Sequence, residues 1–361
     1  DSRFSQKLPL YWALFFLIPT FYVYDTFYLF IAIVLCALYF LPFRVLSWFV
    51  LIFYLAVIYF TPKPFIDVYT ISSMAADFFL KGINPYTQHY PDIYDGLYGY
   101  APIFAYLPGA LYLETISKFL FYDFRVVLVL AWWATPFLFP TSQESEKLKK
   151  MWWLLPLLPF GFIQAWLDPL IAFFAGLALW AKKNKRYGWL IIAIAFAASI
   201  KQYGFLIGFF ILLALLMQKE WKVFFRLFFY SFVLFFLLVA PFLFWNLDAL
   251  IHSTIQEIFD WKPRMDSFNL IGLILSIKKN LNVSYINTLG LVMSLLGFFI
   301  AIFHVKKNGQ ANKFNVIAEA WVIVFGMIII FGKQAFYNYY SLMVSFLLLS
   351  MAFKGNAKKG Q

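Results

Sequence analysis

The chain has 361 residues, of which 63% are hydrophobic and 13% are charged, and its net charge is +12. Soluble domains contain roughly 45–50% apolar and about 25% charged residues, and a soluble core of this size cannot bury so much apolar surface. The composition therefore excludes an ordinary soluble protein and requires lipid as the solvent for most of the chain. We expect one transmembrane domain over residues 1–361.

Apolar runs that approach the roughly 20 residues of a membrane-crossing helix recur along the chain. The run 151–181 contains prolines and is interpreted as one kinked crossing, with a hairpin of two half-spans as the alternative. The run 187–217 is divided, because a single crossing would place Lys201 at mid-membrane, which is costly. We thus expect an all-α, polytopic bundle of about 12 spans. They are residues 8–24, 26–41, 43–60, 101–120, 126–140, 151–181, 187–200, 201–217, 222–245, 281–304, 314–332 and 335–353.

Basic residues gather in short segments between the apolar runs, a pattern that sets membrane orientation. It favours an orientation signal over a nucleic-acid surface, so no nucleic-acid partner is expected. Segments with charges of +4, +2, +3 and +3 are 182–186, 218–226, 305–313 and 354–361. Alternation of the spans places these segments and both termini on the cytoplasmic side of a plasma membrane. The long loops 61–100 and 246–280, and the segment 141–150 with a charge of +1, then lie on the external or luminal side.

The sequence contains few residues that could bind a metal ion or take part in redox chemistry. Cys36 is the only cysteine, which excludes an internal disulfide and a cysteine-based metal cluster. The three histidines are scattered without metal-ligand spacing, so we expect no zinc. Carboxylates in loop 61–100 could hold a divalent cation such as Mg or Mn, but nothing requires a cofactor. Arg3 and Lys7 lead into an apolar run without a small-residue cleavage pattern, so no cleaved signal peptide is expected.

Asp67 opens the most informative part of loop 61–100. Residues 68–80 have a helical period with one apolar face, and Gly82 ends this pattern. We expect an amphipathic helix that lies at the outer leaflet beside the bundle. Asp67 would then meet both lipid and water and could act as a general base with a raised pKa. The alternative is that Asp67 caps this helix, which does not exclude catalysis.

The second half of the same loop is rich in turns and tyrosine. Asn84 and Pro85 mark the turn, and the tyrosines are Tyr86, Tyr90, Tyr94, Tyr98 and Tyr100. Aromatic faces stack on the C–H groups of a sugar, and phenol hydroxyls bond to its hydroxyls. The alternative is the aromatic belt of a membrane interface.

Arg264 is the main cationic candidate in loop 246–280. Its planar guanidinium matches a phosphate, which suits a lipid-linked donor at the membrane boundary. A salt bridge with Asp260 or Asp266, or a lipid head-group contact, is an equally good explanation. Lys201 and Lys333 lie at short external turns and are further phosphate candidates, with snorkelling as the alternative.

Asp168 lies inside a predicted span, and Gln164 precedes it by one helical turn. An intramembrane carboxylate is a functional candidate because its burial is costly, although a structural hydrogen bond across the kink explains it too. The residue also suits a membrane transporter or lipid flippase, which is the alternative function. A membrane scaffold is a third class, and it would need neither Asp67 nor Arg264.

The chain resembles the GT-C class of integral membrane glycosyltransferases, and within it the polyprenyl-phosphate-mannose-dependent mannosyltransferases. The resemblance begins at about residue 43 and covers most of the chain from there. It is carried by Asp67-Val68-Tyr69, Ala75-Ala76, Gly82-Ile83-Asn84-Pro85-Tyr86, Tyr100-Ala101-Pro102, Gln164 to Asp168, Ser199-Ile200-Lys201-Gln202, Arg264 to Leu270 and Lys333 to Tyr340.

This resemblance implies a fold of GT-C type and a definite chemistry. Asp67 would be the catalytic base, and Arg264, with Lys201 or Lys333, would bind the donor phosphate. The donor would be mannose or another hexose on a polyprenyl or dolichyl phosphate, transferred with inversion to a lipid or glycan acceptor. A single Asp in the acidic motif leaves a metal requirement open. Further substrate-binding residues would be Tyr69, Asn84, Tyr86, Tyr100, Gln202 and Tyr339.

Overall fold

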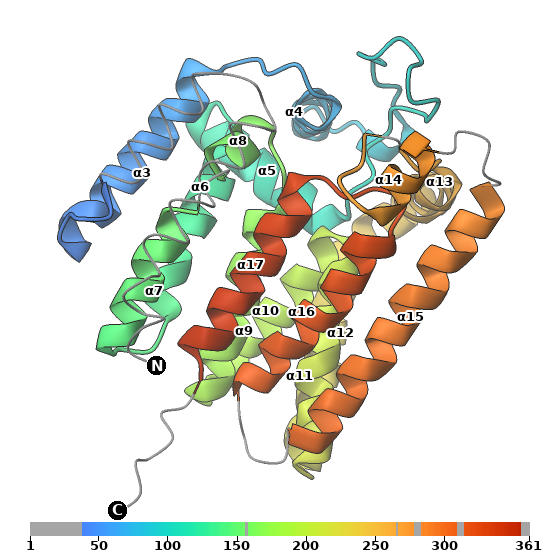
Figure 1. Cartoon of the computed structure of the whole chain (residues 1–361). Helices are drawn as coiled ribbons and strands as arrows, with labels where there is room; N and C mark the ends of the chain where they lie inside the picture. Colours follow the sequence, from blue (N-terminus) through green and yellow to red (C-terminus); the bar gives the residue numbers. More distant parts are fainter. Residues whose placement is uncertain (1–37, 156–157, 265, 278–282, 309–313, 355–361) are drawn as a thin grey trace, which may run out of the picture.

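The computed structural model describes residues 38–155, 158–264, 266–277, 283–308 and 314–354. All regular structure in these ranges is helical, which confirms the all-α class (Figure 1). The expected spans 8–24 and, apart from its last residues, 26–41 lie outside them. Four helices within the ranges are long and apolar enough to cross a membrane. They are α3 (Phe43–Phe60), α12 (Trp221–Ile251), α15 (Val283–Asn308) and α16 (Phe314–Phe331).

Shorter apolar helices fill the centre of the bundle. Almost every side chain of α9 is buried, as expected for a helix that is apolar on all sides, and α9 packs against α6, α10 and α17. A stacked pair of tryptophans, Trp132 and Trp152, lies in the same core with ring centroids 4.4 Å apart. The shorter helices are α6 (Val126–Ala134), α9 (Asp168–Lys183), α10 (Tyr187–Ile200), α11 (Phe205–Met217) and α17 (Tyr337–Ala352).

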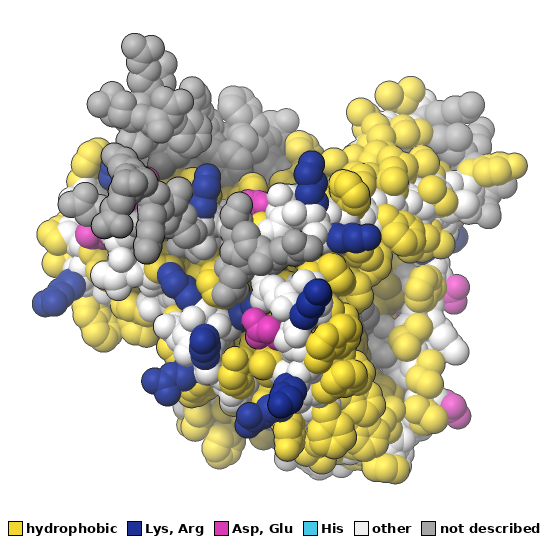
Figure 2. All heavy atoms as spheres, turned by 90° about the horizontal axis from the view of Figure 1, so that it is seen from below, with side chains coloured by type: hydrophobic (Ala, Val, Ile, Leu, Met, Phe, Trp, Pro, Cys, Tyr) yellow, Lys and Arg dark blue, Asp and Glu magenta, His cyan; other side chains and the backbone are white. Residues whose placement is uncertain are grey.

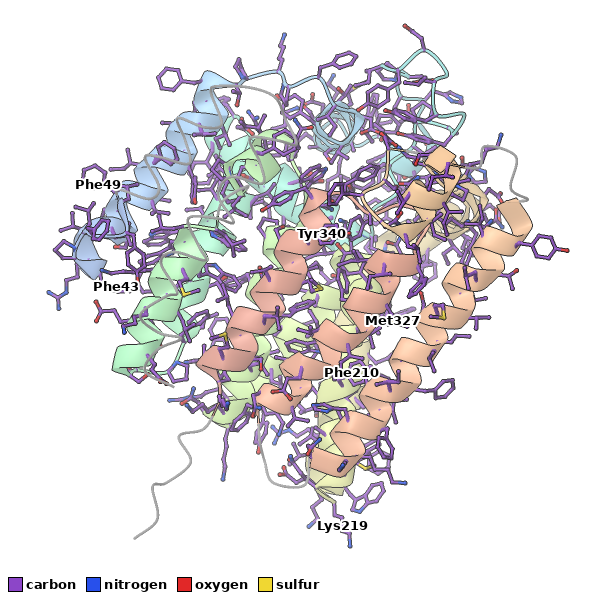
Figure 3. The ribbon with its side chains drawn as sticks, in the orientation of Figure 1. Phe43, Phe49, Phe210, Lys219, Met327 and Tyr340 are labelled. Atoms are coloured by element: carbon purple, nitrogen blue, oxygen red, sulfur yellow. The ribbon has the colours of Figure 1, made fainter. Side chains whose placement is uncertain are left out.

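The helices connect two chemically different ends. One end, the loop end, carries the irregular segments together with α4 (Asp67–Leu80), η1 (Pro85–Thr87), α13 (Glu257–Asp260) and α14 (Leu270–Ile277). The opposite end, the basic end, includes Lys183 and Lys219, and Figure 2 shows many basic side chains on it. Figure 3 labels Lys219 there and Tyr340 on the part of α17 nearer the loop end.

The expected span 101–120 is wrong, because α5 (Pro108–Phe121) does not run between the two ends. Its start is held at the loop end by the bond from the Leu107 amide to the Ile200 carbonyl, 3.2 Å. Its last residue also lies there, since the Tyr59 hydroxyl donates to the Phe121 carbonyl at 3.0 Å. The helix therefore lies across the loop end, where its polar residues pack against α4.

The expected single crossing at 151–181 is also wrong. The chain forms α7 (Gln143–Trp153), the short α8 (Leu158–Ile163) and then α9 as separate helices. The ring of Phe353, which directly follows α17, lies 6.4 Å from the Phe139 ring and 6.0 Å from the Lys183 amine. The segment before α7 and the end of α9 therefore both lie at the basic end. The break before α9 includes Ala165 with a φ of 60°, which no α-helix can contain.

These two corrections change where residues 141–150 lie. The segment was expected beside the long loops, but it lies at the basic end together with the other lysine-rich turns. One predicted crossing is lost at α5 and one is gained at α7, so the alternation of all later helices is unchanged. The positive charge of this segment is thus on the same end as the other basic segments.

The helix expected after Asp67 is present as α4, and it is packed rather than free. Its inner face, with Ile71 and Ala75 buried, joins an aromatic and apolar cluster with α5 and α12. Gly82 follows the helix with a φ of 70°, a left-handed conformation that glycine adopts without strain. This packing fixes the direction of α4 and hence the position of Asp67 at its start.

Labelling of introduced cysteines tests the corrected path of the chain. In a Cys36→Ser background, we expect an impermeant maleimide to label Lys147→Cys and Lys219→Cys from the same side of sealed membranes. Leu97→Cys, on the loop end, should be labelled from the other side only. Labelling of Lys147→Cys from the same side as Leu97→Cys would show that residues 141–150 do not reach the basic end.

Candidate functional site

Asp67 is the first residue of α4, and both of its carboxylate oxygens are engaged. Oδ1 accepts from the Val68 amide at 2.7 Å, which satisfies a free N–H of the first helical turn. Oδ2 accepts from the Tyr100 hydroxyl at 2.6 Å. The Tyr94 hydroxyl accepts from the Asp67 amide at 3.4 Å. Asp67 is thus not the N-cap that the alternative proposed, because the helix begins at Asp67 and its N-cap residue is Ile66. Its carboxylate bonds to the first helical turn and is half-buried beside the tyrosine loop.

Five planar groups from three segments contact one another in a row, here called the stack, beside Asp67. The Tyr100 ring lies between Trp261, with centroids 5.5 Å apart, and Tyr98, with centroids 5.9 Å apart and planes at 9°. The Arg264 guanidinium carbon lies 3.5 Å from the Tyr98 centroid and 4.6 Å from the Phe336 centroid. Cation–π attraction of this kind stabilises an arginine against aromatic faces. Asp67 and Arg264 are therefore connected through two tyrosines.

Arg264 is held by Asp266, as one of the alternatives expected. Nε donates to Oδ1 at 2.9 Å, Nη2 donates to Oδ2, and the Tyr98 hydroxyl donates to Oδ2 at 3.3 Å. Burial would raise the pKa of Asp266, but the hydrogen bonds and charge of Arg264 outweigh it and hold that pKa below its usual value. Among the described residues, none accepts from Nη1 of Arg264, so the guanidinium keeps donors for a ligand.

Lys333 belongs to the same region through its backbone. Its carbonyl accepts from the Arg264 amide at 3.2 Å, and the Phe268 amide donates to the Ala335 carbonyl at 2.8 Å, so the two segments run side by side. The Lys333 amine donates to the Phe259 carbonyl. Burial lowers its pKa, and the charge of Asp260 opposes this only in part.

A second polar cluster surrounds Asp168, which is 2% exposed. Its carboxylate accepts from the Lys201 amine at 3.3 Å, from the side-chain nitrogen Nδ2 of Asn338 at 2.8 Å and from the Tyr203 hydroxyl. The Lys201 ammonium also lies over three aromatic rings, at 5.1 to 5.6 Å, and these belong to Tyr106, Tyr203 and Tyr339. These hydrogen bonds to Asp168 join the start of α9, the turn between α10 and α11, and the start of α17.

Gln202 and Gln164 behave differently in this cluster. Gln202 donates to the Ala105 carbonyl at 3.1 Å and to the Thr254 carbonyl at 2.8 Å, so it ties the loops together. Gln164 does not sit one helical turn from Asp168, because the chain breaks between them. Gln202 therefore belongs to the loops around this cluster, whereas Gln164 is separated from Asp168 by a break in the helix.

Tyr106 lies between the two clusters. Burial raises the pKa of its hydroxyl, and the negative charges of Glu114, Asp67 and Asp168 raise it further. The segment that contains Lys333 contacts Arg264 and then continues into Asn338 at Asp168. The two clusters are thus neighbours at one end of the bundle.

Three of the expected substrate-binding residues lie outside the stack and support the loop instead. The Tyr69 hydroxyl donates to the Pro62 carbonyl at 2.6 Å, and its ring covers the buried guanidinium of Arg125. The buried Tyr86 hydroxyl donates to the Tyr106 carbonyl at 2.8 Å. The side-chain oxygen Oδ1 of Asn84 accepts from the Tyr86 amide at 3.0 Å and so caps η1.

Glu114 on α5 was not identified from the sequence. Its side chain is fully buried, and neither carboxylate oxygen has a hydrogen-bond partner in the described part of the chain. Burial raises the pKa of Glu114 to about 8, which the neighbouring Ser72 hydroxyl offsets only in part. An acidic residue within a predicted span was the signal that could have revealed it. Within the described ranges, no group of three or more His, Cys, Asp or Glu residues could hold a metal ion.

Comparisons with protein-family models, with curated proteins and with solved structures find no match to this chain. The assignment of a function therefore depends on the geometry of the loop end.

Removal of the Asp168 carboxylate should destabilise the fold. Asp168→Ala leaves the buried Lys201 ammonium without its counter-charge, and breaking a buried pair in this way costs about 3–5 kcal/mol. We expect a clear fall in the midpoint of thermal unfolding in detergent. Asp95→Asn, a matched change at an exposed residue whose φ of 50° asparagine tolerates, should leave the midpoint unchanged. Equal midpoints for Asp168→Ala and the wild type would contradict a structural role for the pair.

Glu114 predicts a specific pH dependence of stability. Its pKa is about 8 in the folded chain, against an ordinary value of 4.5. Ionisation of Glu114 therefore costs the fold nothing below pH 4.5, and this cost grows as the pH rises to about 8. Each unit of that difference corresponds to about 1.4 kcal/mol. We expect Glu114→Gln to melt at a higher temperature than the wild type at pH 8, with the difference shrinking towards pH 5. The exposed Glu144→Gln serves as control, and a pH-independent difference would refute the assignment.

Proposed function

We propose that this chain is a membrane glycosyltransferase that moves a hexose, such as mannose, from a polyprenyl or dolichyl phosphate to a lipid or glycan acceptor. The observation that carries the proposal is the pairing of Asp67 with Arg264 across Tyr100 and Tyr98 at one end of an apolar helical bundle. A carboxylate can accept the acceptor's proton, and a guanidinium can receive the donor's phosphate. The apolar helices would keep the donor's tail in lipid.

The proposal includes an orientation in a plasma membrane. With residues 141–150 on the basic end, every strongly basic turn of the described chain lies on that end, which we assign to the cytoplasm. The loop end would then face the external or luminal side. The two termini would lie on the cytoplasmic side.

The proposed reaction is a single displacement. As the acceptor's hydroxyl oxygen attacks the anomeric carbon, its proton passes to Asp67 Oδ2, and the bond from that carbon to the phosphate oxygen breaks. The sugar becomes bonded to the acceptor oxygen with inverted configuration, and the polyprenyl phosphate leaves with the electron pair of the broken bond. Arg264 stabilises the charge that develops on the phosphate. Tyr100, which donates to Asp67, is a positioning residue that aims the carboxylate.

Lys333 supports this phosphate site better than Lys201 does. Lys333 is joined to Arg264 through its backbone, and burial lowers its pKa without a carboxylate bound to it. Lys201 is already neutralised by Asp168 and enclosed by three tyrosine rings. We therefore assign Lys333 to the donor phosphate and Lys201 to the framework of the site.

Transport or lipid flipping is a weaker proposal on the same geometry. A transporter's coupled charges are expected near mid-membrane in broken helices. The Asp168–Lys201 pair lies where α9 and α17 begin, at the loop end, and its carboxylate is saturated by three donors. A buried ion pair with this many hydrogen bonds is expected to hold the helices in place and not to change during transport.

Substitution of the two central residues tests the enzyme. With labelled polyprenyl-phosphate mannose and membrane-lipid acceptors, Asp67→Asn should lower the transfer rate by about 10²–10⁴-fold, the usual value of a general base. Arg264→Gln should lower it by about 10²–10³-fold, as for a lost oxyanion donor. Asp95→Asn, in the same loop, should retain the wild-type rate. Transfer by Asp67→Asn at the wild-type rate would remove Asp67 from catalysis.

A further inference from the structure

Several buried polar side-chain atoms at the loop end have no partner among the described residues, and two of them, on Trp261 and Gln334, belong to the segments around Arg264. The indole N–H of Trp261 and the side-chain amide nitrogen of Gln334 are inaccessible to solvent and have no partner among the described residues. Buried donors are almost always paired in folded proteins, because an unpaired one loses its bonds to water without compensation. Each such donor is therefore a place where a ligand can supply the missing acceptor.

The position of Trp261 distinguishes it from other unpaired tryptophans. The indole groups of Trp132 and Trp321 are also unpaired, but they are sealed in the core between packed helices. Trp261 remains partly accessible as a residue, lies in an irregular segment, and contacts Tyr100, which holds Asp67. A single residue, Tyr100, thus separates the Trp261 ring from Asp67.

Gln334 lies on the segment that pairs with Arg264. The residues on either side of it are held, since Lys333 accepts from the Arg264 amide and Ala335 accepts from the Phe268 amide. Further along the same segment, the side-chain oxygen Oδ1 of Asn338 is buried and has no donor among the described residues. The segments around Arg264 therefore offer unpaired donors and an unpaired acceptor, all of them uncharged.

This combination matches the hydroxyl groups of a sugar rather than a phosphate. A hydroxyl both accepts and donates, whereas a phosphate accepts only and calls for cations, which Arg264 and Lys333 provide separately. An indole ring can in addition stack on the C–H face of a pyranose. We propose that Trp261 and Gln334 bind the hexose of the lipid-linked donor, a role that rests on the proposed function. The free energy lost by their unpaired donors is recovered when the sugar binds.

Binding measurements separate sugar recognition from phosphate recognition. The probes are a short-chain polyprenyl phosphate with and without an attached hexose, titrated into the purified full chain in nanodiscs. Trp261→Phe keeps an aromatic ring but removes the N–H, and Gln334→Leu removes the amide at a similar size. Each should weaken binding of the hexose-bearing lipid by about 10-fold, the effect of one lost hydrogen bond. Binding of the sugar-free lipid should be unchanged.

Arg264→Gln and Trp221→Phe complete the set of variants. Arg264→Gln should weaken binding of both lipids, and Trp221→Phe, at an exposed position on the first turn of α12, should weaken neither. Equal weakening of both lipids by Trp261→Phe and Gln334→Leu, or no change in either, would overturn the sugar assignment. If one of these variants does not fold, the other decides the question alone.

A different set of binding results would show that the proposed function itself is wrong. If the wild type binds neither lipid, an alkyl hexoside without phosphate becomes the deciding probe. Binding of that hexoside which is lost in Trp261→Phe and Gln334→Leu would support the sugar site and refute the lipid-linked donor. Absence of hexoside binding as well would overturn both.

Discussion

The loop end depends on one buried carboxylate, that of Asp168. It accepts hydrogen bonds from Lys201, Tyr203 and Asn338, which come from the turn between α10 and α11 and from the start of α17. A charge buried in a low-dielectric interior is tolerated only when it is paired and fully bonded. Helices α9, α10, α11 and α17 therefore cannot separate at this end without leaving an unpaired charge. Because the bond from Asn338 to Asp168 fixes the start of α17, it also fixes the segment that precedes α17. That segment in turn holds the backbone of Arg264.

Support for the proposed chemistry comes from two differently built halves. Asp67 is fixed by the packed helix α4, which lies against α5 and α12. Arg264 is fixed in an irregular segment by backbone pairing with Lys333 and by aromatic faces. Tyr98 and Tyr100 join the halves, so a displacement of either loop changes the distance between Asp67 and Arg264. Precise placement of this kind is what a displacement reaction requires.

The sequence predicted the helical class, the turn at Lys201 and the shared end of Asp67 and Arg264, since burial cost and charge alternation are local properties. It did not predict that α5 lies across the loop end, because hydrophobicity measures affinity for lipid but not direction. The polar face of α5, with Glu114, Thr115 and Ser117, carried that information. The stack of Trp261, Tyr100, Tyr98, Arg264 and Phe336 depends on contacts between distant loops, for which no local pattern exists.

Asp266 has a consequence for which lipids this protein would retain. Because that carboxylate already neutralises Arg264, the guanidinium exerts little long-range attraction on the anionic phospholipid head groups that surround any membrane protein. A head group that offers charge alone meets a guanidinium that is already neutralised, and it would gain little by binding there. Only a molecule that adds further contacts can compete, so the built-in counter-ion acts as a filter against the abundant lipids of the bilayer itself.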